Sequence, residues 1–419
     1  MDSDLELIEV ERKRSNPEGD QQPSSQLQSL PRHLVLCILS RLPVSSLVRL
    51  KSVCRGWRML AQDPDLVNMH STCIDAENNP CLIFHSDCTT RERLYFVDFP
   101  ACSHGEEKVI KRFRVPSRKA LRKFDVLGSS NGLLCLSASL HQNDAALYVC
   151  NPFIRNYVRL PNYPTQYPNQ EVIFGFGFHP TTKEYKVIKL VYYRRDGTFY
   201  QYRPDASAYI TDSEVQIFTL GSSNWRSLGK ARDRYFSNQS LSQALVNGRL
   251  HWVTLPDLQR MEIISFDLAD EQFREVPSTT LKGTLYNLVV LGGYLSAAVC
   301  LNSGTLEIWV MREYDVESSW IKKLNIRAHM PKGLEEDLTS QIFNNSRIRR
   351  HGGIWRHMSA WSWPRVLCLL KTGEILMEYK SGVLVSYDPK SGEFKDLMFQ
   401  GIPKWYRTIV HAGSLNWID

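Results

Sequence analysis

The amino-acid sequence predicts a mainly β protein, in which a six-bladed β-propeller follows a small all-α module. Three observations predict this class. Hydrophobic residues follow a helical period over residues 29–71 and a strand period of two from residue 72 onward. Aromatic residues make up 11% of the 419 residues, which suits the flat packing surfaces of sheets. A turn-and-strand motif then recurs at the spacing of about 40–50 residues that is typical of four-stranded propeller blades.

The composition limits the classes of function. The net charge of +7 is small for 419 residues, so it does not favour a nucleic-acid partner. The chain has no run of about 18 apolar residues and its first residues are acidic, so neither a membrane span nor a secretory signal is expected. The ten cysteines include no C-x-x-C pair and several lie in apolar runs, as free thiols do in a reducing compartment. We therefore expect the protein in the cytoplasm, the nucleus or both.

Three regions are expected along the chain. Residues 1–28 are polar and mixed in charge, which predicts a disordered tail. Residues 29–71 predict three short helices, of which Pro31 can open the first and Pro43 ends it, while the third ends before Pro64. Val53 and Trp57 are expected to pack inside this module. Residues 72–419 read as strands separated by turns and form the propeller.

The helical module carries more apolar surface than it can bury by itself. Some forty residues form only a small core, so three short helices cannot bury all their apolar faces against one another. A purely internal role for these residues is the simpler alternative, but an amphipathic face that enters a partner's groove accounts for them better. The residues expected on this face are Leu30, Pro31, Leu34, Ile38, Leu39 and Leu47.

The repeated motif sets the number of blades. A turn-forming Asn or Asp is followed six residues later by an aromatic residue and nine residues later by an aliphatic one. Its three clear copies are Asn151, Tyr157 and Leu160; Asp267, Phe273 and Val276; and Asp388, Phe394 and Leu397. Weaker copies are centred on Phe113, Trp225 and Trp320. Six copies predict six blades, with insertions in the two longest intervals, near residues 192–209 and 327–363.

Turn signals and strand counts complete the predicted propeller. Hairpin turns are expected inside the blades at Asn131-Gly132, Asn247-Gly248, Gly292-Gly293 and Thr372-Gly373. Residues 81–116 supply only about three strands, whereas residues 408–419 offer one strand in excess. We expect this C-terminal strand to complete the first blade and close the ring, because closure leaves no exposed sheet edge.

The second long insertion is the strongest candidate for a target-binding site. It contains clustered arginines interleaved with three tryptophans, and the combination of forked cation and aromatic ring suits an acidic or phosphorylated peptide. We expect Arg349, Arg350 and Trp355 to contribute to this site. The same composition also fits single-stranded nucleic acid, and a solvated loop that covers a blade is an equal alternative. The Tyr- and Arg-rich insertion from Tyr192 to Tyr209 is a second candidate.

No motif predicts catalysis, a metal or a cofactor. The cysteines and histidines between residues 70 and 104 have spacings that do not match a zinc site. Gly175 and Gly177 lack the third glycine and the helix of a nucleotide-binding loop, and we expect them to allow close packing of strands. No Ser-His-Asp, paired-carboxylate or H-E-x-x-H arrangement is present at a recognisable spacing. The sequence thus favours an interaction protein, although a propeller enzyme with an incidental helical extension stays open.

The helical region resembles the F-box. The matching residues are Leu30-Pro31, Leu34, Ile38-Leu39, Arg41-Leu42-Pro43, Ser46-Leu47, Arg49, Val53-Cys54-Arg55, Trp57 and Asp63-Pro64. His33 departs from the pattern, since the family usually has an acidic residue there. Residues from 72 onward resemble the kelch-like, F-box-associated propeller of plant F-box proteins, in segments such as "NPFIRNYVRLP", "FGFGFHPTTKEYKVIKL" and "SYDPKSGEFKDL".

This resemblance, which covers roughly residues 29–400, implies a function. A protein of this kind is the substrate receptor of a ubiquitin ligase built from a Skp-type adaptor, a cullin, a RING subunit and the F-box protein. The chemistry of ubiquitin transfer then belongs to the other subunits, so no catalytic residue is expected in this chain. An F-box protein that acts outside a ligase is the alternative.

Overall fold

The structure is a computed structural model, and it describes a helical module and six β-sheets. The described residues are 30–77, 81–86, 93–98, 111–114, 124–138, 146–162, 170–194, 210–231, 235–236, 244–255, 261–301, 305–327, 364–379, 383–397, 399 and 406–418. The predicted tail of residues 1–28 lies outside them, as do Arg349, Arg350 and Trp355.

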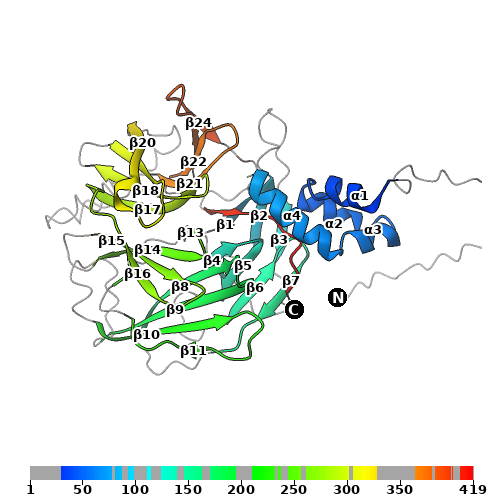
Figure 1. The fold of residues 1–419 in the computed structure, drawn as a ribbon, viewed down its shortest axis with the longest axis horizontal. Coiled ribbons are helices and arrows are strands. Elements are labelled where there is room, and N and C mark those ends of the chain that lie inside the picture. Colours follow the sequence, from blue (N-terminus) through cyan, green and yellow to red (C-terminus); the bar gives the residue numbers. More distant parts are fainter. Residues whose placement is uncertain are drawn as a thin grey trace, which may run out of the picture.

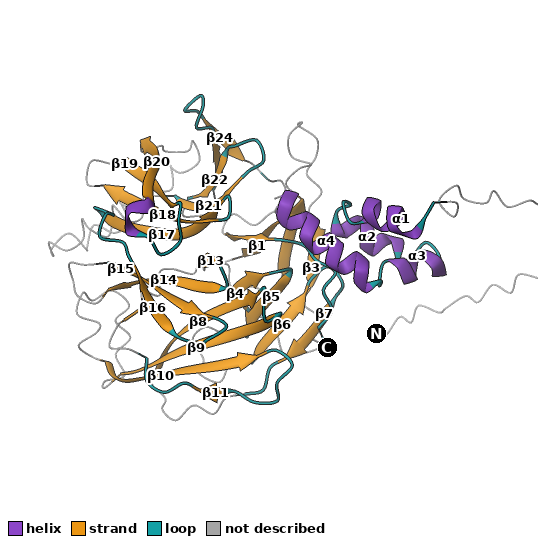
Figure 2. Ribbon diagram, in the orientation of Figure 1, coloured by secondary structure: helices purple, strands orange, loops and turns teal. Residues whose placement is uncertain are grey.

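Four helices form the helical module, residues 30–77, at one side of the strands (Figures 1 and 2). They are α1 (Arg32–Leu39), α2 (Val44–Leu50), α3 (Arg55–Leu60) and α4 (Pro64–Glu77). The sequence predicted three, because Pro64 was interpreted as a stop. Pro64 instead occupies the first turn of α4, where its missing N–H costs nothing, and the Asp63 carboxylate accepts the Asp65 N–H at 3.0 Å. Helix α4 continues past the predicted boundary at residues 71/72.

The module has its own apolar core. Its fully buried members on the helices are Val35, Leu36, Leu39, Val44, Leu47 and Leu66. Trp57 packs against this core as expected. Val53 does not, because it lies in the turn between α2 and α3 and its side chain is 64% exposed.

The propeller begins with three sheets. The first joins β1 (Cys81–Ser86), β2 (Arg93–Asp98) and β3 (Lys111–Arg114) to β25 (Tyr406–His411). The second contains β4 (Asp125–Ser130), β5 (Leu133–Ser137), β6 (Leu147–Asn151) and β7 (Asn156–Arg159). The third contains β8 (Gln170–His179), β9 (Glu184–Arg194), β10 (Ile210–Thr219) and β11 (Arg226–Ser227).

Three further sheets complete the ring. The fourth contains β12 (Tyr235–Phe236), β13 (Ala244–Val246), β14 (Arg249–Leu255), β15 (Glu262–Asp267) and β16 (Phe273–Val276). The fifth contains β17 (Thr284–Leu291), β18 (Tyr294–Leu301), β19 (Thr305–Met311) and β20 (Trp320–Arg327), with the 3-10 helix η4 (Glu317–Ser319) before β20. The sixth contains β21 (Arg365–Leu369), β22 (Ile375–Glu378), β23 (Leu384–Tyr387) and β24 (Phe394–Leu397). The predicted six-bladed propeller is confirmed.

The ring closes as the strand count predicted. Strand β25 pairs antiparallel with β1, from Cys81 opposite His411 to Ser86 opposite Tyr406. An ion pair on the sixth blade holds the closing strand from the other side. The Arg365 guanidinium donates to the Glu378 carboxylate at 2.6 Å and to the Thr408 carbonyl, and the same carboxylate accepts the Thr408 N–H.

The repeated motif forms the turn between the last two strands of blades two, four and six. In each copy the Asn or Asp side chain accepts a backbone N–H two residues later: Asn151 at 3.0 Å, Asp267 at 2.8 Å and Asp388 at 2.8 Å. The aliphatic residues that end the motif, Leu160, Val276 and Leu397, are buried. Tyr157, the aromatic residue of the first copy, is exposed on the outer strand β7.

The predicted hairpin turns all connect neighbouring strands. Asn131-Gly132, Asn247-Gly248 and Gly292-Gly293 have positive φ at both residues, as a two-residue hairpin turn requires. Gly175 and Gly177 in β8 allow close packing, as the sequence indicated. A Cβ added to Gly175 meets the Trp252 ring of the next blade at 2.7 Å.

Candidate functional site

An apolar stripe lies on the surface of the helical module. Leu30, Leu34 and Ile38 are spaced four residues apart, so they follow one face of α1 and the turn before it. Their side chains are 39%, 42% and 51% exposed. In the part of the chain that the structure describes, ten large hydrophobic residues are exposed, and half of them lie in the module, the other two being Val53 and Met59. This concentration is typical of a surface that a partner covers.

The predicted docking residues divide into two groups. Leu30, Pro31, Leu34 and Ile38 are exposed. Leu39 and Leu47 are fully buried in the module's own core, where they pack behind the exposed stripe. Leu39 lies about 100° around α1 from Ile38. It therefore faces the core that residues of α2 and α4, including Leu47, share. A partner that covers the stripe would reach only the first group directly.

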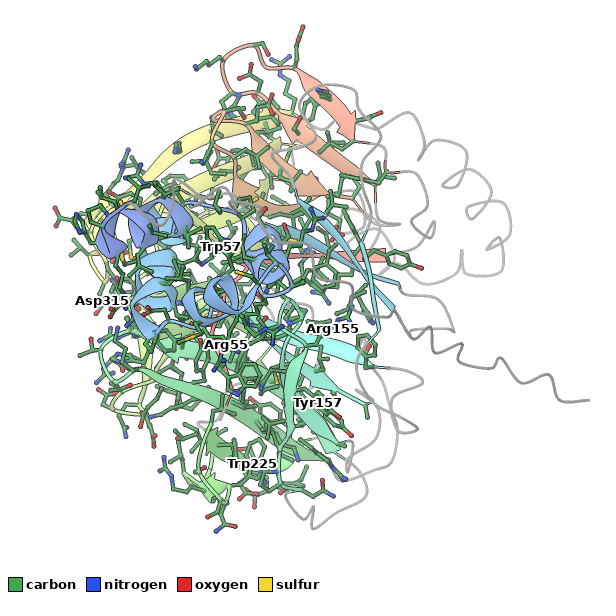
Figure 3. All side chains as sticks on the ribbon, turned by 90° about the vertical axis from the view of Figure 1, so that its right-hand side faces the viewer. Arg55, Trp57, Arg155, Tyr157, Trp225 and Asp315 are labelled. Atoms are coloured by element: carbon green, nitrogen blue, oxygen red, sulfur yellow. The ribbon has the colours of Figure 1, made fainter. Side chains whose placement is uncertain are left out.

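The surroundings of the stripe are basic. Residues 30–62 contain six arginines and lysines and no aspartate or glutamate. Arg41, Arg49 and Arg55 are exposed, and Figure 3 labels Arg55 and Trp57 on the side of the molecule that faces the viewer, where the module lies. An apolar stripe in a basic setting is complementary to an apolar groove with an acidic rim.

Two polar contacts join α4 to the rest of the module. Arg32 at the start of α1 forms ion pairs with Asp63 and Asp65 at the start of α4. Burial raises the pKa of the Asp63 carboxyl, but the hydrogen bond and charge of Arg32 together with backbone N–H groups of α4 outweigh it, so that the pKa is lowered overall. The His70 ring contacts the Leu42 carbonyl at 3.1 Å, and burial lowers the pKa of this imidazole. Helix α1, which carries the stripe, is therefore held by polar contacts at its first residue and in the turn that follows it.

One group of ionisable side chains on the propeller is linked by several contacts and has a structural role. His251 on β14 contacts the Tyr314 hydroxyl at 2.7 Å and the Ala244 carbonyl at 2.9 Å, so both ring nitrogens have partners. Burial lowers the pKa of His251 to about 4, which keeps the ring neutral. Arg249 lies over the Tyr314 ring and donates to Asp267 at 2.8 Å. These contacts join blades four and five.

No arrangement for metal binding or for membrane insertion is found in the described ranges. Among those residues, no three His, Cys, Asp or Glu side chains gather as a set of metal ligands would. None of the described helices is long and apolar enough to span a membrane.

Comparison with known proteins defines the class to which this fold and surface belong. Residues 81–347 match the model of the F-box associated β-propeller domain, and residues 27–69 match the F-box-like model. The chain belongs to the family of F-box proteins with an F-box associated propeller. It is 45% identical to F-box protein At3g07870 of Arabidopsis thaliana over 407 residues, which are 94% of this chain and 93% of that protein.

More distant relatives are also F-box proteins. F-box/kelch-repeat protein At3g23880 of Arabidopsis thaliana is 26% identical over 71% of this chain and 79% of its own length. F-box protein CPR1 of the same plant is 25% identical over 93% of this chain and 89% of its own length. Family membership supports a role as an F-box substrate adaptor, and proteins of this family are generally not catalytic. The F-box implies a Skp-type adaptor as partner.

Proposed function

We propose that this chain is the substrate-receptor subunit of a ubiquitin ligase that also contains a Skp-type adaptor, a cullin and a RING subunit. In this role it links a target protein to ubiquitination, in the cytoplasm, the nucleus or both. The observation that carries the proposal is the exposed apolar stripe on the helical module, which belongs to a body distinct from the propeller (Figure 1). The helical module is thereby available for the adaptor, and the propeller for the target.

The stripe supplies the contacts to the adaptor. Leu30, Pro31, Leu34 and Ile38 enter the adaptor's groove, and Leu39 and Leu47 support them from the module's core. The exposed arginines around the stripe meet acidic side chains at the rim of the groove and steer the encounter.

The target binds to the propeller. We propose that Arg349, Arg350 and Trp355 form part of the target site, because arginines fork onto carboxylate or phosphate while an indole supplies an apolar anchor. Substituting all three with Ala is expected to abolish target capture and to leave adaptor binding unchanged. If the triple variant captures the target normally, the site lies elsewhere, and the insertion from Tyr192 to Tyr209 is the next candidate.

Reconstitution with purified partners tests the ligase role. The full chain is co-expressed with a Skp-type adaptor and mixed with cullin, RING subunit, E1, E2 and ubiquitin. We expect one complex on size exclusion, and ubiquitin transfer to the receptor or its bound target that depends on the chain. An adaptor complex that does not recruit cullin would support the alternative function outside a ligase, whereas no adaptor complex at all would overturn the proposal.

A further inference from the structure

The segment that follows the closing strand contacts both bodies of the protein. This tail segment, residues 412–418, comes directly after β25 and runs toward β7 (Figure 1). Leu415 is buried in the core of the helical module, together with residues of α1, α2 and α4. Gly413 fits between Val44 of α2 and Phe153 of the second blade, because a Cβ added there would lie 3.2 and 3.1 Å from them.

Hydrogen bonds fix the same segment to the propeller. The Asn151 amide donates to the Ser414 carbonyl at 3.0 Å and to the Asn416 carbonyl at 2.9 Å. The Asn156 amide and the Ile418 backbone exchange two hydrogen bonds, each 3.2 Å long. These contacts give hydrogen-bond partners to backbone groups of Ser414, Asn416 and Ile418, in a segment that lies outside the sheets.

A contact with the third blade completes the attachment. The Asn416 amide donates to the Asn131 carbonyl and to the Tyr185 hydroxyl, both at 3.0 Å. The tail segment thus spans blades two and three. A Cβ added to Gly132, beside Asn131, would lie 1.8 Å from the Ser414 hydroxyl, so only glycine leaves room for the segment there.

The turn of blade two differs from its two equivalents at the positions that touch the tail segment. Asn151 corresponds to Asp267 and Asp388, which form the same turn but have no amide to donate. The two residues after Pro152 are Phe153 and Ile154, where the equivalent turns carry Ala269 with Asp270 and Lys390 with Ser391. Formation of the turn requires neither the amide nor the apolar pair. Instead, the Asn151 amide donates hydrogen bonds to the tail segment, and Phe153 and Ile154 pack against the core of the helical module.

The Phe153 side chain of the second blade contacts the first blade, the closing strand β25 and the helical module. Its ring stacks on His411 at 5.8 Å and meets Phe96 edge-on at 5.7 Å, and it also packs against the core of the helical module. The His411 Nδ1 contacts the Ser129 hydroxyl at 2.9 Å. His411, the last residue of β25, is therefore in contact with the Phe153 side chain, which packs against the helical module.

From these contacts we infer that the tail segment is an internal docking element that fixes the orientation of the helical module on the propeller. Residues 406–411 close the ring, and the next seven residues bind the module to it. The module is thus held at two places, by the chain that leads from α4 into β1 and by Leu415 in its core. The inferred role of the tail segment does not require the proposed function. Its consequence, that the adaptor-binding stripe is held at a set distance from the target site, does rest on the proposed function.

Two pairs of matched variants test the inference in the full chain, co-purified with a Skp-type adaptor. Leu415→Asp places a charge in the module's core, whereas Trp417→Asp makes the same change on an exposed side chain of the same segment. Asn151→Asp keeps the turn but removes both donated bonds, and Asp388→Asn is the reverse change in a turn that the tail segment does not touch.

Hydrogen exchange and small-angle scattering give the readouts. For Leu415→Asp and Asn151→Asp we expect backbone amides of residues 412–418 to exchange at least about tenfold faster than in the wild type. Each variant loses contacts that hold the segment in place, so the segment opens more often. We also expect a broader distribution of distances within the particle, with adaptor binding retained. The two control variants are expected to match the wild type.

Identical exchange and scattering in Leu415→Asp and Trp417→Asp would overturn the inference. If Asn151→Asp unfolds the second blade, the Leu415 pair still decides the question, because Leu415→Asp leaves Asn151 and its turn unchanged and places its charge in the core of the helical module. If the wild type does not bind the adaptor, the proposed ligase function is wrong, and the exchange and scattering comparison is then made on the full chain by itself.

Discussion

Truncating the apolar stripe is expected to weaken adaptor binding and to leave the fold unchanged. The perturbation is Leu30→Ala, Leu34→Ala and Ile38→Ala in one chain. The exposed fractions of 39%, 42% and 51% together amount to somewhat more than one complete side chain. Burying a whole Leu or Ile side chain contributes about 1.5–3 kcal/mol, so the loss relative to Ala is about 1.5–3 kcal/mol, or roughly 10- to 100-fold in Kd.

The matched control is Ile321→Ala on β20, because that isoleucine is 40% exposed on the fifth blade and far from the stripe in sequence. Adaptor binding is measured by calorimetry or interferometry, and unfolding by urea. We expect a weaker Kd only for the triple variant, and a free energy of unfolding within about 0.5 kcal/mol of the wild type for both. An unchanged Kd would refute the assignment of the docking face, and a large loss of stability would show that the stripe belongs to the core.

Two further predictions concern the joints between blades. Glu271 accepts a hydrogen bond from Lys186 at 2.8 Å; burial raises the pKa of its carboxyl, but bonds from basic side chains outweigh this and lower it. This contact between blades therefore contributes its full stabilisation above the ordinary carboxyl pKa of 4.5, and the stabilisation is lost as the pH falls through the lowered pKa. Glu271→Ala should decrease the free energy of unfolding in urea at pH 7 by about 3 kcal/mol. The exposed Asp270→Asn should decrease it by less than about 1 kcal/mol. Arg365→Met should likewise cost about 3 kcal/mol by leaving Glu378 buried without its cation, and an unchanged melting temperature would disprove this account of closure.

Local patterns predicted the parts of this fold that depend on neighbours in sequence. Asn151, Asp267 and Asp388 each form a turn with a residue two positions away, and such turns can be read from composition and spacing. Ring closure could be predicted as well, because a missing strand and an extra strand have only one arrangement that leaves no open edge.

Apart from ring closure, the sequence did not predict contacts between residues far apart in the chain. Nothing near Leu415 indicates that it belongs to the core of helices that begin at residue 32, and nothing near Lys186 indicates its partner in the next blade. Leu39 and Leu47 were grouped with the exposed residues of α1, because a helical period identifies an apolar face and leaves open what covers it. The fourth helix was missed because proline both ends helices and begins them.

The tail segment also has a consequence for biosynthesis. The helical module leaves the ribosome first, and the residues that close the ring and dock against that module, from Tyr406 onward, follow more than 300 residues after Glu77. Because translation adds about 5–20 residues each second, the nascent module waits some tens of seconds for Leu415, with part of its core uncovered. A product of premature termination would therefore present an open sheet edge and an incomplete module together, both of which are surfaces that chaperones and proteases recognise.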